Sequence, residues 1–235
     1  MERILLRAGF INARKRFEEA GMHLLRDPVY GEDYGRGWVF FSYCITSPIS
    51  AGIALFSRDE ALSRIPLSHC GIVTGERCCI EATDPGVIFS DFKAKYLDDP
   101  TIVVFLRRPQ NLDEDISTAM IEHARDQLGK GYAYKGVFGS ALYNILGLHK
   151  IGWFRKGKNP FNAKDEYFCS ELVAESMIIG YPNRPGTLIY HPSNIYPVTL
   201  FEDKEIFDPW RVDVVEKKTK EGRIVESVGE VPNAA

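Results

Sequence analysis

The hydrophobic pattern of the first part of the chain separates a helical segment from a strand-rich one. Residues 2–26 carry apolar side chains at helical spacing with basic residues between them, which predicts an amphipathic helix that ends at Asp27-Pro28. Residues 38–56 are apolar and rich in β-branched and aromatic side chains, which favours strands. We expect the helix to bury its apolar face on the domain or on a second copy of the chain.

Further strands are predicted between residues 67 and 106. Residues 67–73 form an apolar run that is followed by a turn at 74–76, and residues 78–82 return as the hairpin partner. Residues 87–89 suggest another strand. The run 102–106 is apolar at every position and therefore predicts a strand that is buried on both faces.

The second half of the chain predicts two helices around an irregular segment. Asn111 can cap the first helix, with Glu114 three residues later as in a capping box, and Gly129 ends it. Residues 129–166 are rich in Gly, Lys and aromatic residues, a composition typical of a substrate loop. Residues 170–179 predict the second helix, and the tail from residue 216 is polar.

Composition excludes several classes of protein. Among 235 residues, 45% are hydrophobic, which supports a buried core, and the net charge of -3 argues against a nucleic-acid partner. The five cysteines are odd in number and irregularly spaced, which favours a reducing compartment over a disulfide framework. We see no signal peptide and no window of ~20 apolar residues, so the expected location is cytoplasmic, without an integral membrane segment.

Cys169 lies in the segment that is most informative about chemistry, Tyr-Phe-Cys-Ser-Glu-Leu-Val, at the predicted start of a helix. A cysteine at a helix start lies beside free backbone amides and the positive end of the helix dipole, which stabilise a thiolate. A thiolate is a nucleophile, and the same amides can hold the oxyanion formed on attack. The alternative is a buried structural cysteine that opens a core helix.

His69 lies on the predicted strand Leu-Ser-His-Cys-Gly-Ile-Val and can present an imidazole into a cleft. Cys70 is the rival nucleophile, but successive strand residues point to opposite faces, which places it poorly for pairing with His69. A three-residue loop at 74–76 sets Glu81 directly opposite His69, where its carboxylate can orient the ring. A two-residue loop pairs His69 with Ala82 instead.

Together these motifs resemble the permuted papain-like enzymes of the NlpC superfamily, and the YiiX-like members in particular. The strand motif around His69, the Ile-Glu-Ala around Glu81 and the Cys-Ser-Glu-Leu-Val at Cys169 carry the resemblance, with Gly-Lys-Gly-Tyr at 129–132 as a further shared feature. The order His, Glu, Cys along the chain is the circularly permuted order.

The resemblance implies an α+β fold in which an antiparallel sheet packs against a helix that starts at the nucleophile. It covers roughly residues 36–200, and we expect residues 36–215 to form the catalytic domain, with residues 1–35 as a helical extension and residues 216–235 as a flexible tail. It implies Cys169 as nucleophile, His69 as base and Glu81 as orienting residue. Substrate-binding positions are Tyr167 and Ser170, which flank the cysteine, and Tyr132 and Tyr134 of the aromatic loop.

The implied activity is hydrolysis of an amide or peptide bond through a thioester on Cys169, in a substrate such as a peptidoglycan peptide or a small amide. Such chemistry requires neither a metal nor an organic cofactor. A possible partner is a second copy of the chain, bound through the N-terminal helix.

Several alternatives stay open at the level of sequence. Lecithin:retinol acyltransferases share the permuted core, so acyl transfer from a lipid ester, or thioesterase activity, is one alternative. A conventional papain order with His191 as base is another, and a non-catalytic binding module with a degenerate site is a third. A metal site built from His69, Cys70, Cys78 and Cys79 is disfavoured because adjacent strand cysteines point apart.

Overall fold

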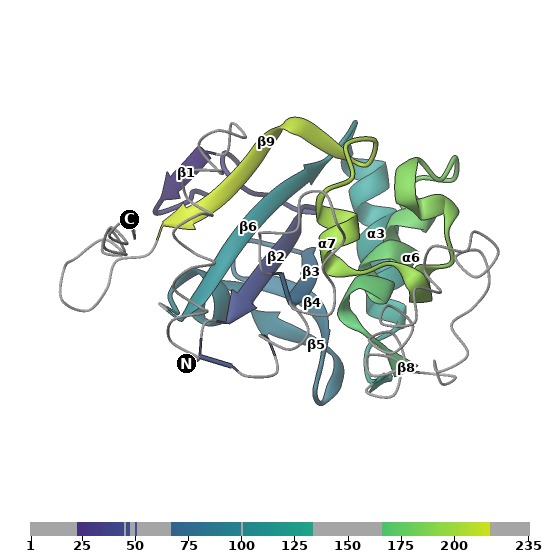
Figure 1. Ribbon diagram of the computed structural model, residues 1–235, viewed down its shortest axis with the longest axis horizontal. Helices are drawn as coiled ribbons and strands as arrows, with labels where there is room; N and C mark the ends of the chain where they lie inside the picture. Colours follow the sequence, from purple (N-terminus) through teal and green to yellow (C-terminus); the bar gives the residue numbers. More distant parts are fainter. Residues whose placement is uncertain are drawn as a thin grey trace, which may run out of the picture.

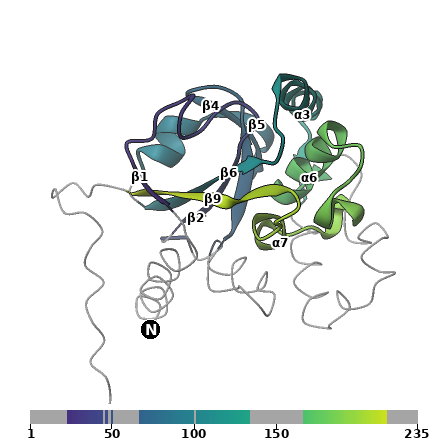
Figure 2. The same ribbon diagram turned by 90° about the horizontal axis from the view of Figure 1, so that it is seen from above.

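The fold is a mixed α+β arrangement built on a largely antiparallel sheet. The structure is a computed structural model that describes residues 23–44, 46–47, 50, 67–99, 101–133 and 166–216. In the described part, a seven-stranded sheet has the order β1-β9-β6-β2-β3-β4-β5. Figure 1 shows the twisted sheet with the helices gathered beside it, and Figure 2 shows α3, α6 and α7 together on one side.

The strands of the main sheet are β1 (His23–Arg26), β2 (Val39–Cys44), β3 (His69–Val73), β4 (Cys78–Thr83), β5 (Gly86–Asp91), β6 (Ile102–Pro109) and β9 (Phe207–Glu216). Two short strands, β7 (Gly131–Tyr132) and β8 (Glu166–Tyr167), pair separately in parallel. The helices are α3 (Glu114–Asp126), α6 (Cys169–Gly180) and α7 (Pro197–Phe201), with a π-helical turn η1 (Lys93–Leu97) and 3₁₀ turns η3 (Gly186–Ile189) and η4 (Pro192–Asn194).

Two apolar clusters cover the two faces of the sheet. Alternation along β6 divides its side chains, so that Phe105 packs on the helix side while Val104 and Leu106 pack on the other. Burial of residues 104–106 on both faces confirms the interpretation of the apolar run. On the helix side lie α3 and α6, and on the far side the turn η1 contributes Tyr96.

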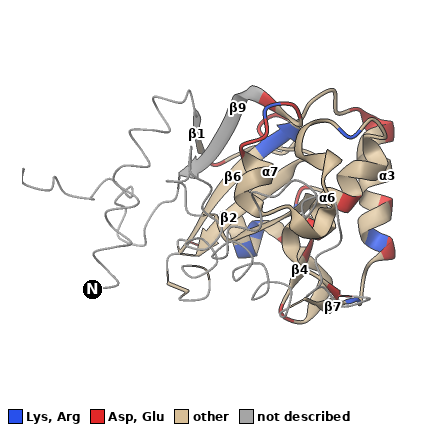
Figure 3. Ribbon diagram, turned by 45° about the vertical axis from the view of Figure 1, so that its right-hand side comes forward, with Lys and Arg blue, Asp and Glu red and all other residues tan. Residues whose placement is uncertain are grey.

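Helix α6 lies at the centre of the helical layer. Most of its first nine residues are buried, and its final residue, Gly180, allows α3 to approach, since a Cβ there would lie 2.9 Å from Met120 and 3.0 Å from Ile116. Helix α3 carries charges of both signs, whereas Glu171 and Glu175 are the charged residues of α6 (Figure 3). None of the described helices has the length and apolar character that crossing a membrane requires.

The helix predicted over residues 2–26 is wrong at its C-terminal end. Residues 23–26 form β1, which pairs in parallel with β9 at the edge of the sheet. The helical spacing of apolar residues predicted a helix here, but residues 23–26 pair instead with β9 from the far end of the chain. Residues 2–22, including the proposed dimer contact, lie outside the described residues, as do residues 217–235 of the expected tail.

The predicted start of α3 also needs correction. The N-cap is Asp113, whose Oδ1 accepts a hydrogen bond from the amide of Ile116 at 2.8 Å. Asn111, the expected cap, lies earlier in a left-handed conformation with φ 53°. Asn is common both at a helix N-cap and in the left-handed conformation, so the sequence pattern placed the N-cap two residues too early.

Candidate active site

The β3–β4 hairpin sets the geometry of His69 and Glu81. The observed register pairs Ile72 with Ile80 and Val73 with Cys79, and extending it places Glu81 opposite Gly71, not opposite His69 as expected. The predicted position of the turn, residues 74–76, was therefore wrong, because Thr74 N donates to Cys78 O at 2.8 Å and the turn lies at residues 75–77. A register shift of two residues keeps every side chain on its face, so His69 and Glu81 still meet as a diagonal pair, with Nε2 2.6 Å from Oε2.

Gly71 leaves the room that this diagonal contact needs. Phe40 is its partner on β2, and a Cβ at position 71 would lie 2.6 Å from the Phe40 ring. The Phe40 and His69 ring centroids are 6.0 Å apart, and the His69 ring stacks on Tyr96 at 6.1 Å with 6° between planes. The imidazole is thus fixed between aromatic rings on the face of the sheet that carries Glu81.

Glu81 is a fully buried carboxylate with three hydrogen-bond donors. Its Oε2 accepts from His69 and from the hydroxyl of Tyr96, and its Oε1 accepts from Lys95 Nζ at 2.7 Å. Burial alone opposes ionisation, but the hydrogen bonds and charges of His69 and Lys95 prevail and hold the pKa of Glu81 well below its usual range. The carboxylate is therefore ionised at neutral pH.

Cys169 is the first residue of α6, and its sulfur interacts with β3. Amides alternate in direction along a strand, and Val73 N donates to Trp38 O at 2.9 Å, so the amide of Cys70 points away from β2, towards the β4 side. The pairing of β3 with β4 begins at Ile72, two residues after Cys70. Interactions with the thiol and the amide of Cys70 lower the pKa of the Cys169 thiol.

The Cys169 thiol and the His69 imidazole each shift the pKa of the other group towards its charged form. The hydrogen bond from the Cys70 thiol, followed by the charge of and hydrogen bond from His69, lowers the pKa of Cys169 well below its ordinary value despite burial. Burial opposes protonation of His69, but the Cys169 charge and the hydrogen bonds of Cys169 and Glu81 raise its pKa to about 9. Because Nε2 faces Glu81, Nδ1 is the ring nitrogen left for Cys169.

The surroundings of Cys70 and His191 do not favour the two sequence alternatives. Cys70 is fully buried, and burial followed by its hydrogen bond to Cys169 raises its pKa well above the ordinary value, so it donates to the nucleophile and is not one itself. His191 interacts through Nδ1 with the Ser193 hydroxyl at 2.8 Å, and the histidine beside the Cys169 sulfur is His69.

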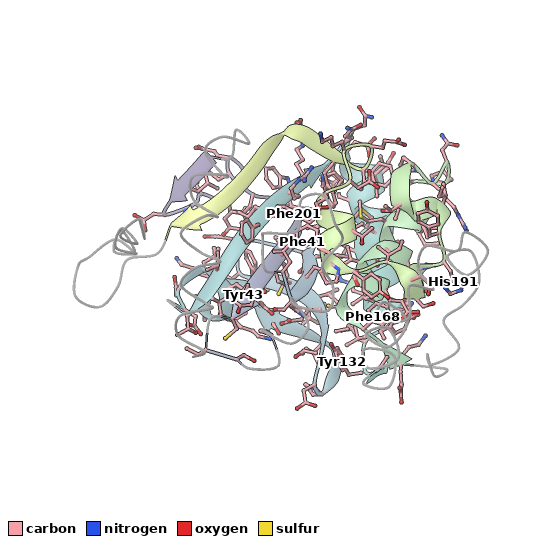
Figure 4. The ribbon with its side chains drawn as sticks, viewed as in Figure 1. Phe41, Tyr43, Tyr132, Phe168, His191 and Phe201 are labelled. Carbon is pink, nitrogen blue, oxygen red and sulfur yellow. The ribbon has the colours of Figure 1, made fainter. Side chains whose placement is uncertain are left out.

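The expected substrate-binding residues have different surroundings. Burial raises the pKa of Tyr132, and the charges of Cys169 and Cys70 raise it further, which indicates that Tyr132 lies near these cysteines. It pairs with Tyr167, the residue before Phe168, and Figure 4 labels both Tyr132 and Phe168. The Tyr167 hydroxyl bonds to Glu175 at 2.8 Å, on the side of α6 that faces α3.

Ser170 is fully buried, and its hydroxyl donates to Ile195 O at 2.6 Å, which anchors the start of α6. Its hydroxyl is therefore used inside the fold. Tyr134 lies outside the described residues. Of the expected wall positions that the structure describes, Tyr132 is the one whose pKa is raised by the charge of Cys169.

Sequence reasoning missed Lys95 and Tyr96, the two residues of η1 that bind Glu81. They lie in the sequence Lys-Ala-Lys-Tyr-Leu, which forms a single π-helical turn and shows no alternation of apolar and polar residues that would predict a strand. A signal was present, because a buried carboxylate predicts a basic or hydroxyl partner. The sequence alone does not identify which residue supplies it.

Among the five thiols we expect Cys169 to be alkylated first by iodoacetamide near pH 6. Its lowered pKa provides the reactive thiolate, whereas burial raises the pKa values of Cys70 and Cys79. Cys78 begins β4 and is exposed, so it is the competing thiol. Mass-spectrometric mapping of wild type beside a Cys78→Ser variant measures the selectivity, and preferential labelling of Cys44 or Cys70 contradicts it.

Comparison with known proteins gives no family assignment. A scan against models of protein families finds no match to the chain, and a search of curated proteins finds none. Within the described residues, no group of three or more His, Cys, Asp and Glu side chains is arranged to hold a metal ion. The function must therefore be inferred from the arrangement of Cys169, His69 and Glu81.

Proposed function

We propose that the chain is a cysteine hydrolase that cleaves an amide or peptide bond through a thioester on Cys169. One observation carries the proposal, namely that the buried Glu81 carboxylate lies 2.6 Å from the ring of His69, whose charge lowers the pKa of Cys169 at the start of α6. A thiolate paired with an imidazolium is a nucleophile and a proton donor held in one site. A structural cysteine needs neither.

The proposed reaction begins with attack of the Cys169 sulfur on the carbonyl carbon of the substrate. The carbonyl oxygen gains the negative charge, which free amides at the start of α6 can stabilise. When the carbon–nitrogen bond breaks, His69 gives its Nδ1 proton to the leaving amine. A thioester on Cys169 and a neutral imidazole remain.

Water completes the proposed cycle. Neutral His69 takes a proton from water as the oxygen attacks the thioester carbon, and the carbon–sulfur bond breaks to release a carboxylic acid. The thiolate and the imidazolium are then restored. Glu81 holds the ring through Nε2 in both half-reactions, so Nδ1 faces the reacting atoms.

We propose further that the enzyme has the permuted papain-like architecture of the NlpC superfamily, in its YiiX-like form. In support, the base and the orienting carboxylate come from adjacent antiparallel strands, and the nucleophile comes later in the chain at the start of a buried helix. That order and those element types agree with the motifs around His69, Glu81 and Cys169 in the sequence.

A covalent adduct on Cys169 tests the proposed function. Wild-type protein is incubated with peptidoglycan peptides, simple amino-acid amides and phospholipids, and its intact mass is compared with that of Cys169→Ala. We expect a mass increase with a peptide or an amide that the variant lacks. An adduct formed only with phospholipid contradicts amide hydrolysis and indicates acyl transfer from a lipid.

A further inference from the structure

The turn η1 supplies the buried carboxylate Glu81 with a second cation. Lys95 Nζ lies 2.7 Å from Oε1, on the oxygen that His69 does not contact. The Lys95 side chain is 39% exposed while that of Glu81 is 0% exposed. The ammonium thus joins the buried carboxylate to solvent, and its Nζ also lies 5.2 Å from the centre of the Tyr96 ring.

The proposed reaction changes the charge beside Glu81. When His69 is protonated, its imidazolium balances the carboxylate, but after the proton leaves with the amine the ring is neutral. A fully buried carboxylate without a cation is unstable and tends to take up a proton. The Tyr96 hydroxyl donates a hydrogen bond but adds no charge. Lys95 is the cation that contacts Glu81 in both states.

We propose that Lys95 is a positioning residue that keeps Glu81 ionised in both protonation states of His69 and thereby sets the upper pH limit of the Cys169–His69 ion pair. This inference rests on the proposed function. With Lys95 present, neutral His69 still faces a carboxylate and retains its proton on Nε2. The positive charge of Lys95 also opposes protonation of His69, so the pair loses its last proton at a lower pH than it otherwise would.

Other titratable groups around the pair come from several elements. Helix α6 provides Cys169, β3 provides Cys70, β4 provides Cys79, η1 provides Tyr96 and β7 provides Tyr132. Burial raises the pKa values of Cys70, Cys79, Tyr96 and Tyr132, which are therefore neutral near pH 7. Within the part of the chain that the structure describes, Lys95 is thus the cation beside Glu81, other than His69, that can affect this titration.

Titration of His69 in the absence of substrate tests the inference. The His69 ring signal, assigned by its loss in His69→Ala, is followed by NMR from pH 5 to 11 in wild type and in Lys95→Met. Because a positive charge is removed close to the ring, we expect the midpoint to rise by about half a pH unit or more. The pH profile of Cys169 alkylation should move in the same direction.

Matched variants separate charge from packing. Lys93→Met removes the same charge from an exposed position of the same turn and should leave the midpoint unchanged. Lys95→Gln keeps a hydrogen-bond donor without the charge and should reproduce the rise, which also serves if Lys95→Met fails to fold. Lys95→Arg keeps the positive charge and should therefore keep the wild-type midpoint of the His69 titration.

Two outcomes overturn the role of Lys95. One is an unmoved midpoint in folded Lys95→Met or Lys95→Gln, and the other is an equal rise in Lys93→Met. Since the titration uses no substrate, these outcomes are independent of the proposed function. Absence of any adduct in the substrate panel counts against hydrolysis alone, whatever the titration shows.

Discussion

Cys169→Ala and His69→Ala should each lose nearly all turnover, by roughly 10³-fold or more in kcat, once a substrate is in hand. The first variant removes the nucleophile. The second removes the proton donor and also the charge that keeps Cys169 ionised. Because each residue depends on the other, the double variant should be hardly slower than either single one, and steady-state kinetics on the three proteins measures this.

His191→Ala is the matched control for this series. It removes a histidine whose Nδ1 interacts with Ser193, and it should keep most of the turnover if His69 is the base. The alternative in which His191 is the base makes the opposite prediction. Activity that survives in His69→Ala and disappears in His191→Ala would show that the assignment of the base is wrong.

The sequence predicts the common face of His69 and Glu81 more reliably than their register. Strand side chains alternate, so any odd-numbered loop between the two strands puts these residues on one face. The expected and observed registers differ by two residues, and the pairing of their side chains survives as a diagonal contact. Gly71 favours that contact, because no side chain separates the two groups.

Other parts of the site depend on contacts that a local pattern does not encode. Lys95 and Tyr96 reach Glu81 because η1 folds over the sheet after β5. Ser170 was expected at the pocket from its place next to Cys169, but on a buried helix neighbouring residues point in different directions. Strand β1 likewise required a partner, β9, from the far end of the chain.

Glu81→Gln should be less stable than wild type by roughly 2–3 kcal/mol at pH 6, because the amide keeps the shape but loses the charge that binds His69 and Lys95. Its effect on turnover should be smaller than that of Cys169→Ala, since an amide oxygen can still accept a hydrogen bond from the ring. Urea unfolding followed by circular dichroism gives the free energy of unfolding. Glu122→Gln, a change at an exposed position of α3, is the matched control and should lie close to wild type.

The pH dependence of this difference identifies its cause. The folded-state pKa of Glu81 lies below its ordinary value of 4.5, so its charge contributes stability that is fully present above pH 4.5 and is lost as the pH falls towards the folded-state pKa. Protonation of the unfolded carboxylate removes up to about 1.4 kcal/mol per pH unit. Wild type and Glu81→Gln should therefore converge between pH 4.5 and pH 2.5. His69 is protonated in the folded state throughout that range, because its pKa is about 9. A difference that stays constant down to pH 2.5 would mean that packing, and not the charge of Glu81, accounts for the loss.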